Sequence, residues 1–491
     1  MVEGQIIRMK QRSLKINAIF NGIKQCCTIL FPLITFPYVS RVLGNSGYGK
    51  YSFSQSITSY FLLIAALGIN TYAIREGAKI RENKKKITKF CSQIFSINIL
   101  SAVFSYICLF ITLIVSAKIG GYSPYILVQS TAILMAAFGT NWINSIYEDY
   151  LYLTIRYIVV QFVALICMFI FVRTPEDVIP YCIISVFATS GGDIINLYYV
   201  RRYVNIKFTF HMDFRKHIGP LIIFFVNSIA ITIYVSSDIT MLGFFEDDAT
   251  VGVYGFVSKI YNMLKQLVNA VVIVAMPRVA YIIKNRTKEY EEYVSKIFSA
   301  VNILLFPIIV GTFFMSKTMT LVAGGIQYVK GESTLKVLSI ATLFAIYASV
   351  FTNCVLIVNQ QEEKCLKSTI VSAVVNLVLN YVLIPKLGMI GAAITTVIAE
   401  AVNLFMQVRY SSSYFFWMKL KLKESVPCLI GGAGIAVVCI VMNALIDSVG
   451  LRMILAIAFS SAIYFAILLF FGNSIVVCAK NKIKEKIKWV K

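Results

Sequence analysis

Three lysines stand inside long hydrophobic stretches, away from every polar loop of the chain. They are Lys24, Lys259 and Lys265, among 46 Lys and Arg residues in total. A charged side chain in a bilayer core costs at least ~2.5 kcal/mol even on lenient insertion scales, so such residues usually face a wet cavity and serve a function. A cavity lined with positive charge binds anions. These residues therefore predict the binding of an anionic ligand inside a membrane.

The lysines belong to continuous polar faces of two predicted helices. At 100° per residue, one face fills an arc of about 120° and the other an arc of about 100°. The faces consist of Ser258, Lys259, Asn262, Lys265, Gln266 and Asn269, and of Asn17, Asn21, Lys24, Gln25, Thr28 and Thr35. Polar contacts between helices explain the Asn, Ser and Thr side chains but not the lysines. We therefore interpret both faces as the lining of a cavity.

Acidic residues also lie within hydrophobic stretches. They are Asp193, Asp238 and Glu400. Such acids either bind a coupling ion, H⁺ or Na⁺, or neutralise the buried lysines, and the residue types alone leave both readings open. Narrower polar stripes lie nearby, with Ser372, Asn376 and Asn380 on one predicted helix and Thr396, Glu400, Asn403 and Gln407 on the next.

Two prolines interrupt the helix that carries Lys24. Pro32 and Pro37 each remove a backbone hydrogen bond and clash with the preceding turn. We expect the helix to bend there. A bent helix with a cavity lysine is suited to act as a gate, although a static kink gives the same sequence.

The elements that position these residues must be membrane-spanning helices. The 491 residues are 58% hydrophobic and only 14% charged, with a mean hydropathy of +0.77, which is too little charge to cover a soluble protein. Apolar stretches of about 18–25 residues fit helices across a ~30 Å core rather than barrel strands. We predict an all-α polytopic membrane protein with about 14 spans, at 17–39, 52–74, 90–116, 125–146, 153–172, 178–200, 219–243, 252–277, 297–316, 334–358, 369–384, 388–408, 426–445 and 451–472.

The distribution of positive charge predicts the orientation. With the N-terminus in the cytoplasm, roughly three quarters of the 46 Lys and Arg residues fall in cytoplasmic segments, as the positive-inside rule requires. An even number of spans places both termini in the cytoplasm. The net charge of +23 then reflects topology and anionic lipid, so we expect no nucleic-acid partner. We also expect no cleaved signal peptide, since the first apolar stretch is too long for one.

A weak internal repeat predicts two halves. Residues 48–57 align with 251–260, and a Leu-Gly pair precedes each copy. The copies lie six spans apart and so share one orientation, as in transporters whose binding site lies between parallel repeats. We expect two pseudo-symmetric six-helix lobes plus two C-terminal helices. The predicted segments are a basic cytoplasmic N-terminus (1–16), an N-terminal lobe (17–218), a C-terminal lobe (219–425), the last two helices (426–472) and a basic cytoplasmic tail (473–491).

Enzyme and metal signatures are absent from the sequence. The chain has two histidines, His211 and His217, and no P-loop, GxSxG or HExxH motif. No inter-span segment exceeds roughly 20 residues, which leaves no room for a soluble catalytic domain. The 11 cysteines show no CxxC spacing. We predict neither an enzyme, nor a metal site, nor a cofactor beyond the coupling ion.

Several short motifs occur in the same order as in the Wzx-type oligosaccharide flippases, which they resemble. These flippases are polysaccharide-biosynthesis membrane proteins, and their superfamily also contains the lipid II flippases and the MATE exporters. The resemblance spans about residues 12–410. Its pieces are Arg41-Val42-Leu43-Gly44 with Gly47-Tyr48-Gly49; Gly68-Ile69-Asn70-Thr71-Tyr72-Ala73-Ile74-Arg75-Glu76; Trp142 with Glu148-Asp149-Tyr150 and Thr154-Ile155-Arg156; Asp238 with Met241-Leu242-Gly243; Gly252 with Tyr254 and Lys259; Met276-Pro277-Arg278; and Leu387-Gly388 with Gly391-Ala392-Ala393.

The resemblance implies a transporter of the inner membrane of bacteria that works by alternating access. Its substrate would be an oligosaccharide repeat unit on undecaprenyl diphosphate, moved from the cytoplasmic to the outer leaflet for O-antigen or another surface polysaccharide. The three lysines would hold the phosphates, and the Asn and Gln side chains of the polar faces would contact sugars. Arg75 and Arg156 would lie at the cytoplasmic mouth. Partners would be membrane lipid and the polymerase and glycosyltransferases of the pathway, with the flippase itself a monomer.

Three other functions fit parts of the sequence. A MATE-type exporter of cationic drugs should have an acidic cavity, whereas this one is basic. A lipid II flippase, which serves peptidoglycan synthesis, is a second alternative in the same superfamily. A membrane glycosyltransferase or polymerase belongs to a different class and should carry a large loop with catalytic residues.

Overall fold

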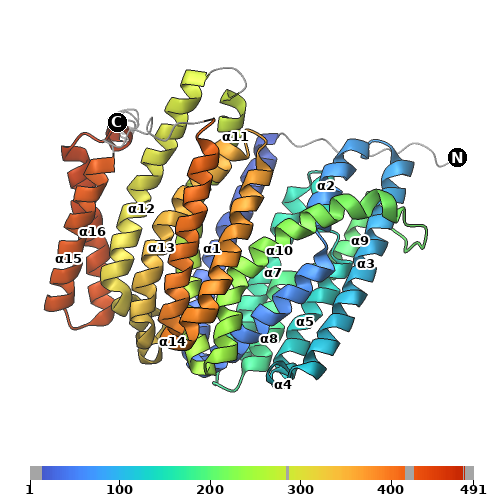
Figure 1. Cartoon of the computed structure of the whole chain (residues 1–491), viewed down its shortest axis with the longest axis horizontal. Coiled ribbons are helices and arrows are strands. Elements are labelled where there is room, and N and C mark those ends of the chain that lie inside the picture. The colour runs from blue at the N-terminus through green and yellow to red at the C-terminus, as the bar shows by residue number, and fades with distance from the viewer. Residues whose placement is uncertain (1–13, 284–286, 415–424, 479, 482–491) are drawn as a thin grey trace. The chain divides into compact units, whose positions relative to one another are not determined.

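The computed structural model of the chain describes residues 14–283, 287–414, 425–478 and 480–481 (Figure 1). Every regular element in these ranges is a helix. The helices of 12 residues or more are α1 (Leu14–Ala66), α2 (Ile69–Ile80), α3 (Lys84–Val115), α5 (Ser123–Phe138), α7 (Tyr150–Phe171), α8 (Val178–Ser190), α10 (Phe214–Phe245), α11 (Asp248–Ile282), α12 (Thr287–Gly324), α13 (Glu332–Phe351), α14 (Glu362–Ser411), α15 (Val426–Leu445) and α16 (Val449–Phe470). Shorter elements are α4 (Ala117–Gly120), α6 (Asn141–Ile146), α9 (Asp193–Tyr199), η1 (Val200–Arg202), η2 (Ile326–Gly331) and η3 (Thr352–Leu356).

The helices have the length and composition of membrane spans. Within the described ranges, 11 are long and apolar enough to cross a bilayer. Helices suit this environment because each satisfies its own backbone hydrogen bonds where no water is present. The prediction of an all-α polytopic membrane protein is confirmed. The count differs from 14 because α1 and α14 each continue through two predicted spans and α5 has only 16 residues.

Glycines mark breaks between helices, two of which fall between predicted spans and one inside a predicted span. Inside α1 and α14 the backbone leaves the helical region only at Gly44 (φ 68°) and Gly388 (φ 56°), where other residues would be strained. The predicted span 52–74 is wrong at its end, because the helix stops at Ala66 and Gly68 (φ 68°) begins the separate α2. The predicted spans 125–146 and 178–200 are likewise each interrupted, between α5 and α6 and between α8 and α9.

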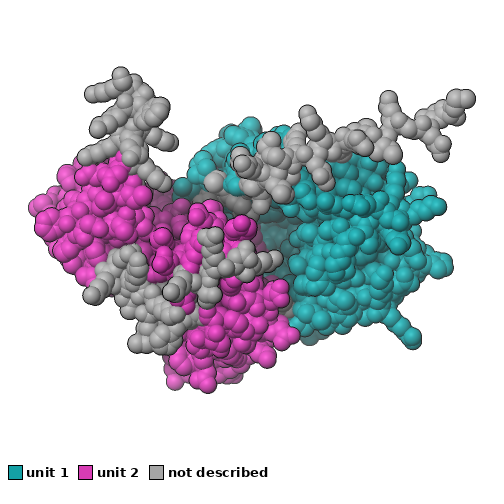
Figure 2. All heavy atoms as spheres, turned by 90° about the horizontal axis from the view of Figure 1, so that it is seen from above, with its two compact units in different colours: residues 1–35, 58–173, 179–228 teal, residues 36–57, 174–178, 229–491 magenta. Residues whose placement is uncertain are grey.

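The chain forms two compact units, which are coloured separately in Figure 2. Unit 1 comprises residues 1–35, 58–173 and 179–228, and unit 2 comprises residues 36–57, 174–178 and 229–491. The boundaries therefore cross α1 twice, between Thr35 and Phe36 and between Ile57 and Thr58, and cross α10 between Ser228 and Ile229. Two more enclose the short segment 174–178.

Each unit has its own apolar core. In unit 1, α2, α3 and α6 pack through fully buried Ile87, Ile94 and Ile143. In unit 2, α11, α12 and α13 pack through Val268, Val301 and other buried side chains, and a further cluster joins α12 to α15 and α16. Because lipid is as apolar as these side chains, close packing rather than exclusion of water holds such helices together. Substitutions at the positions of closest packing should therefore destabilise the protein most.

A close helix approach in unit 2 joins equivalent positions of the internal repeat. A Cβ atom on Gly49 would lie 1.8 Å from the carbonyl oxygen of Asp248, and one on Gly252 would lie 1.8 Å from that of Asn45. Each obstructing carbonyl lies four residues before the opposite glycine, so the contact is reciprocal. Glycine is required on both sides because any side chain would push α1 and α11 apart.

We expect Gly49→Ala to destabilise the protein by about 1–3 kcal/mol or more, because neither helix can move without loss of packing. The measurement is the midpoint of thermal unfolding of the purified protein in detergent. The matched control is Gly311→Ala in α12, where nothing lies within 4 Å of the added Cβ. Equal unfolding midpoints for Gly49→Ala and the control would contradict the close approach.

Candidate functional site

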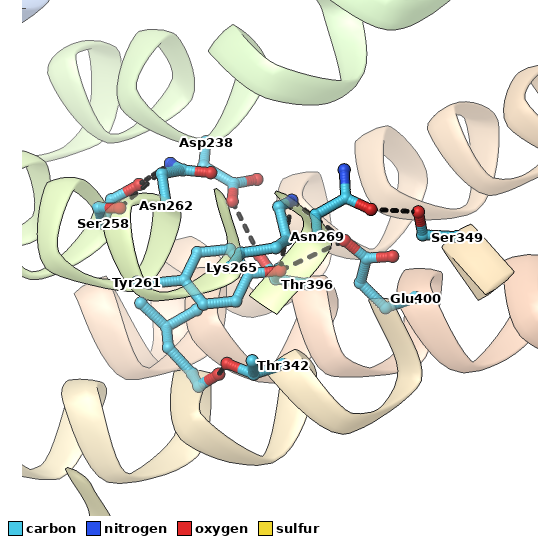
Figure 3. A network of polar contacts seen from close by, with 11 residues as sticks. Asp238, Ser258, Tyr261, Asn262, Lys265, Asn269, Thr342, Ser349, Thr396 and Glu400 are labelled. Carbon is cyan, nitrogen blue, oxygen red and sulfur yellow. Dashed lines mark hydrogen bonds and ion pairs between the residues drawn. The ribbon is translucent and has the colours of Figure 1, made fainter. Parts of the chain in front are cut away.

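Unit 2 holds an ion pair in its interior. Lys265 of α11 places its Nζ 3.5 Å from Oε1 of Glu400 in α14 (Figure 3). The Glu400 side chain is 4% exposed and that of Lys265 28%. Tyr261 supports both partners, because its hydroxyl donates to Glu400 (3.1 Å) and its ring lies 4.9 Å from the ammonium. The structure thus places one of the three predicted lysines against one of the predicted acids.

Asp238 of α10 is buried in a different way. Its carboxylate accepts hydrogen bonds from the Tyr254 hydroxyl (2.6 Å), the Asn380 amide (2.7 Å) and the Thr396 hydroxyl (2.7 Å). All three donors are neutral. Among the described residues, no lysine or arginine forms an ion pair with this carboxylate. Neutralisation by a buried lysine, one of the two sequence-based interpretations of the acids, therefore fits Glu400 but not Asp238.

Two cavities meet at the ion pair, a small polar one and a larger one with both apolar and polar side chains in its lining. The smaller, of about 30 Å³, is lined by Asp238, Glu400 and Lys265 among others. The larger, of about 290 Å³, is lined by polar residues of α11, α13 and α14 together with the same Lys265 and Glu400. The smaller has room for about one water molecule or one small cation. The larger can hold several waters.

The polar face predicted on α11 divides into two parts. Asn262 and Lys265 turn into unit 2, and the Asn262 amide donates to the backbone carbonyl of Ser258 (2.9 Å). Lys259 and Gln266 are exposed instead. Within the described part of the chain, no acid forms an ion pair with Lys259. The exposed part of this face therefore carries an unneutralised positive charge.

Lys24 of α1 is the corresponding cation of unit 1. Its side chain is half-buried, with Nζ 6.0 Å from the ring centre of Tyr157. Its charge interacts with those of Arg156 and Asp193. The side chains of the neighbouring predicted residues Asn21 and Gln25 lie outside the described ones.

Arg156 and Asp193 form a second buried ion pair, in unit 1. Arg156 of α7 is 13% exposed and Asp193 of α9 is 11% exposed, with Nη2 and Oδ1 3.6 Å apart. Asn141 bridges them, donating to Asp193 (2.8 Å) and accepting from Arg156 (2.6 Å). Gly139 and Gly192 make room, since a Cβ on either would crowd the carboxylate or the guanidinium. Arg156 therefore lies within the helical bundle of unit 1 and not in a polar loop.

Other predicted site residues lie elsewhere. Arg75 of α2 is about half exposed and pairs with its neighbour Glu76 (3.0 Å), with its guanidinium 5.0 Å from the Phe224 ring. Pro32 and Pro37 keep helical dihedral angles, and the break in α1 is at Gly44. The boundary between the units nevertheless falls between the two prolines.

Three side chains that contact the candidate site residues were not predicted from the sequence. Tyr254 and Tyr261 contact the buried carboxylates, and Asn141 bridges the ion pair of unit 1. Tyrosines are common at membrane interfaces, so their residue type is a weak signal. The intramembrane acids are the stronger signal for such contacts, because each buried carboxylate requires hydrogen-bond donors nearby.

The two units differ in their charge balance. The cluster of unit 1 contains two cations, Lys24 and Arg156, and one acid, Asp193. Moreover, Nη1 of Arg156 is buried and has no hydrogen-bond partner among the described residues. The internal site of unit 2 contains one cation, Lys265, and two acids, Asp238 and Glu400. Unit 1 is thus suited to bind an anion and the interior of unit 2 to bind a small cation.

Comparison with known proteins identifies relatives along most of the chain. A candidate O-antigen transporter of Escherichia coli (strain K12) is 24% identical over 398 residues, which cover 79% of this chain and 94% of that protein. A candidate low-salt glycan biosynthesis flippase of Haloferax volcanii is 25% identical over 190 residues, covering 38% of this chain and 40% of the relative.

The fold is similar to that of a solved membrane transporter. The lipid II flippase MurJ in an inward closed conformation superimposes with a TM-score of 0.72 at 14% identity, covering 94% of this chain and 100% of the other. At that identity the similarity concerns the fold alone. A family model described as "Polysaccharide biosynthesis protein" matches residues 14–283, which is more than half of the sequence. The chain is therefore a multi-pass membrane protein that belongs to the polysaccharide biosynthesis protein family.

Proposed function

We propose that the protein is a flippase for lipid-linked oligosaccharides. It moves a repeat unit carried on undecaprenyl diphosphate from the cytoplasmic to the outer leaflet of the bacterial inner membrane, where the glycan enters surface polysaccharide such as O-antigen. The family and the names of the relatives support this class of substrate. The observation that carries the proposal is the excess of cations in unit 1, where Lys24 and Arg156 face one acid, Asp193.

A diphosphate is the part of such a substrate that needs this cluster. It cannot leave water unless charge-assisted hydrogen bonds replace its hydration. Nη1 of Arg156 is a buried donor without a partner, and Lys24 has no ion pair within the described residues. These two groups supply donors and charge, while the lipid tail stays in the bilayer.

Further contacts come from the remaining predicted residues. Exposed Lys259 is a second phosphate contact, and Gln266 beside it is a sugar contact together with Asn21 and Gln25. Lys265 and Asn262, which the sequence also suggested as substrate contacts, are held by partners within unit 2 and are not part of this proposed contact set. Arg75 receives the substrate at the cytoplasmic mouth.

The proposed architecture has 14 helices, with lobes at 17–218 and 219–425, two terminal helices and both termini in the cytoplasm. The lobes open alternately to either side. The prolines of α1 act as the gate, an assignment supported by the unit boundary between Pro32 and Pro37. The flippase works as a monomer beside the glycosyltransferases and polymerase of its pathway.

Transport is coupled to H⁺ or Na⁺ at Asp238. A buried carboxylate with only neutral donors gains much from a cation, because an unpaired charge in a dry interior is costly. The adjoining cavity of about 30 Å³ admits an ion of this size. Asp193 and Glu400 already have cationic partners and are less suited to the role.

Two related functions make different demands on the site. A MATE-type antiporter for organic cations needs an acidic cavity of ligand size, whereas the cavity beside Asp238 is far too small for a drug. A lipid II flippase of known structure shares the fold. A protein with that function would use the same contacts to a diphosphate, so the glycan that accumulates in a deletion strain distinguishes it from the proposed function.

Replacing Lys24 or Lys259 with Ala should lower surface polysaccharide by about 10- to 100-fold, since each loses a charge-assisted contact worth about 1.5–3 kcal/mol. The measurement is surface polysaccharide in the producing strain, with the amount of flippase in the membrane determined in parallel. Lys118→Ala removes an exposed lysine from the short helix α4 and should have no effect. Normal polysaccharide in both cavity variants would show that the cationic site is misassigned.

Asp238→Asn should abolish the dependence of flipping on an ion gradient. The amide keeps the size of the carboxylate and one of its two accepting oxygens but cannot carry the charge that attracts a cation. The measurement is the rate of flipping of a lipid-linked oligosaccharide in proteoliposomes, with Na⁺ and pH gradients imposed separately. Asp447→Asn, at an exposed loop acid, serves as the control. A variant at Asp238 that still responds to the gradient would refute coupling at this residue.

A further inference from the structure

Unit 2 buries two carboxylates at one small cavity but holds a single amine there. Asp238, Glu400 and Lys265 all line the cavity of about 30 Å³. A cation that enters this cavity therefore meets two carboxylates, those of Asp238 and Glu400. Which of them receives it depends on where the ammonium of Lys265 lies.

The ammonium is held at Glu400 by more than one contact. Its Nζ is 3.5 Å from the Glu400 carboxylate, 3.5 Å from the Tyr261 hydroxyl and 4.9 Å from the centre of the Tyr261 ring. Glu400 is 4% exposed, so removal of its counter-charge would leave an uncompensated charge in a dry site. The lysine therefore stays beside Glu400 unless another cation replaces it.

Asp238 has no such tethered partner. Three neutral groups donate to it, and Asn380, one of the three, is held in turn by hydrogen bonds with Asn376 and Thr395. Such a set of donors stabilises the carboxylate as an anion without cancelling its charge. Of the two acids, only Asp238 is left to attract a mobile cation.

We infer that Lys265 is a tethered counter-cation that occupies Glu400, reserves the mobile cation for Asp238, and so limits unit 2 to one monovalent cation per transport cycle. The inference rests on the proposed ion coupling and identifies a residue that determines its stoichiometry. Lys265 is a positioning residue here, since it acts through the charge of Glu400.

The ion pair of Lys265 and Glu400 also separates the small cavity from the larger one. Lys265, Glu400, Tyr234 and Val235 line both this cavity of about 290 Å³ and the smaller one, so they form the wall between the two. A cation that moves from the larger cavity toward Asp238 passes this wall. Retention of the ammonium on Glu400 keeps it from competing for Asp238, which the mobile cation must reach.

The test counts the cations bound by the purified full-length protein in lipid nanodiscs. Bound ²²Na⁺ is measured at saturation, and protons taken up are measured in the same samples with a pH indicator. The wild type should bind one cation that Asp238→Asn loses. Lys265→Gln should bind one more than the wild type, because Glu400 is then an acid without a counter-charge. Lys265→Arg should bind the same number as the wild type.

Two further variants separate loss of charge from loss of structure. The double variant Lys265→Gln/Glu400→Gln replaces the ion pair with two amides of similar size and should return to one bound cation. Glu400→Gln alone should weaken Na⁺ binding about tenfold, because the released ammonium competes at the shared cavity. The two single changes thus act in opposite directions, which a general loss of folding cannot produce.

The outcomes distinguish this inference from the coupling on which it rests. If Lys265→Gln binds no more cations than the wild type, Na⁺ and protons counted together, while Asp238→Asn binds one fewer, the role of Lys265 is overturned and coupling stands. If Asp238→Asn binds as many cations as the wild type, coupling at Asp238 is itself overturned, and the inference with it.

Discussion

The organisation of this protein depends on the cost of placing a charge where there is no water. In a helical membrane protein every backbone group is satisfied within its own helix, so charged side chains are the groups that still demand partners. Lys265 meets that demand with Glu400, and Arg156 with Asp193. Asp238 meets it only in part, through neutral donors. The functional proposals follow from the buried groups whose charge or hydrogen-bonding capacity is not fully matched by a partner.

The cost of burying a charge also explains why the two units, both built from apolar helices, differ in their balance of acidic and basic side chains. Each unit buries basic and acidic side chains between helices. In unit 1 the cations exceed the acids, with an unpartnered donor on Arg156, whereas in the interior of unit 2 the acids exceed the cations. A transporter that couples an anionic substrate to a cation needs both signs of charge at separate sites, and one chain here provides them.

The sequence predicted the membrane-spanning helices better than it predicted the backbone breaks between them. Periods of hydropathy identified the membrane helices because a bilayer demands about 20 apolar residues for each span. They separated the spans at Gly44 and Gly388 but could not locate the break at Gly68, inside the predicted span 52–74, where conformation and not polarity decides. They also gave no means to see that Gly49 and Gly252, matched in a weak repeat, lie against each other.

By itself, the sequence determined the class of protein and the candidate site residues, because hydrocarbon selects so strongly against charge that Lys24, Lys265, Asp238 and Glu400 stand out within their apolar stretches. Which lysine has an acid beside it was decided by the tertiary structure. Lys259 and Lys265 share one helical face, yet one is exposed and the other is paired with an acid 135 positions later in the chain. Such pairing depends on distances of a few ångströms between helices, which the periodicity of a single helix does not contain.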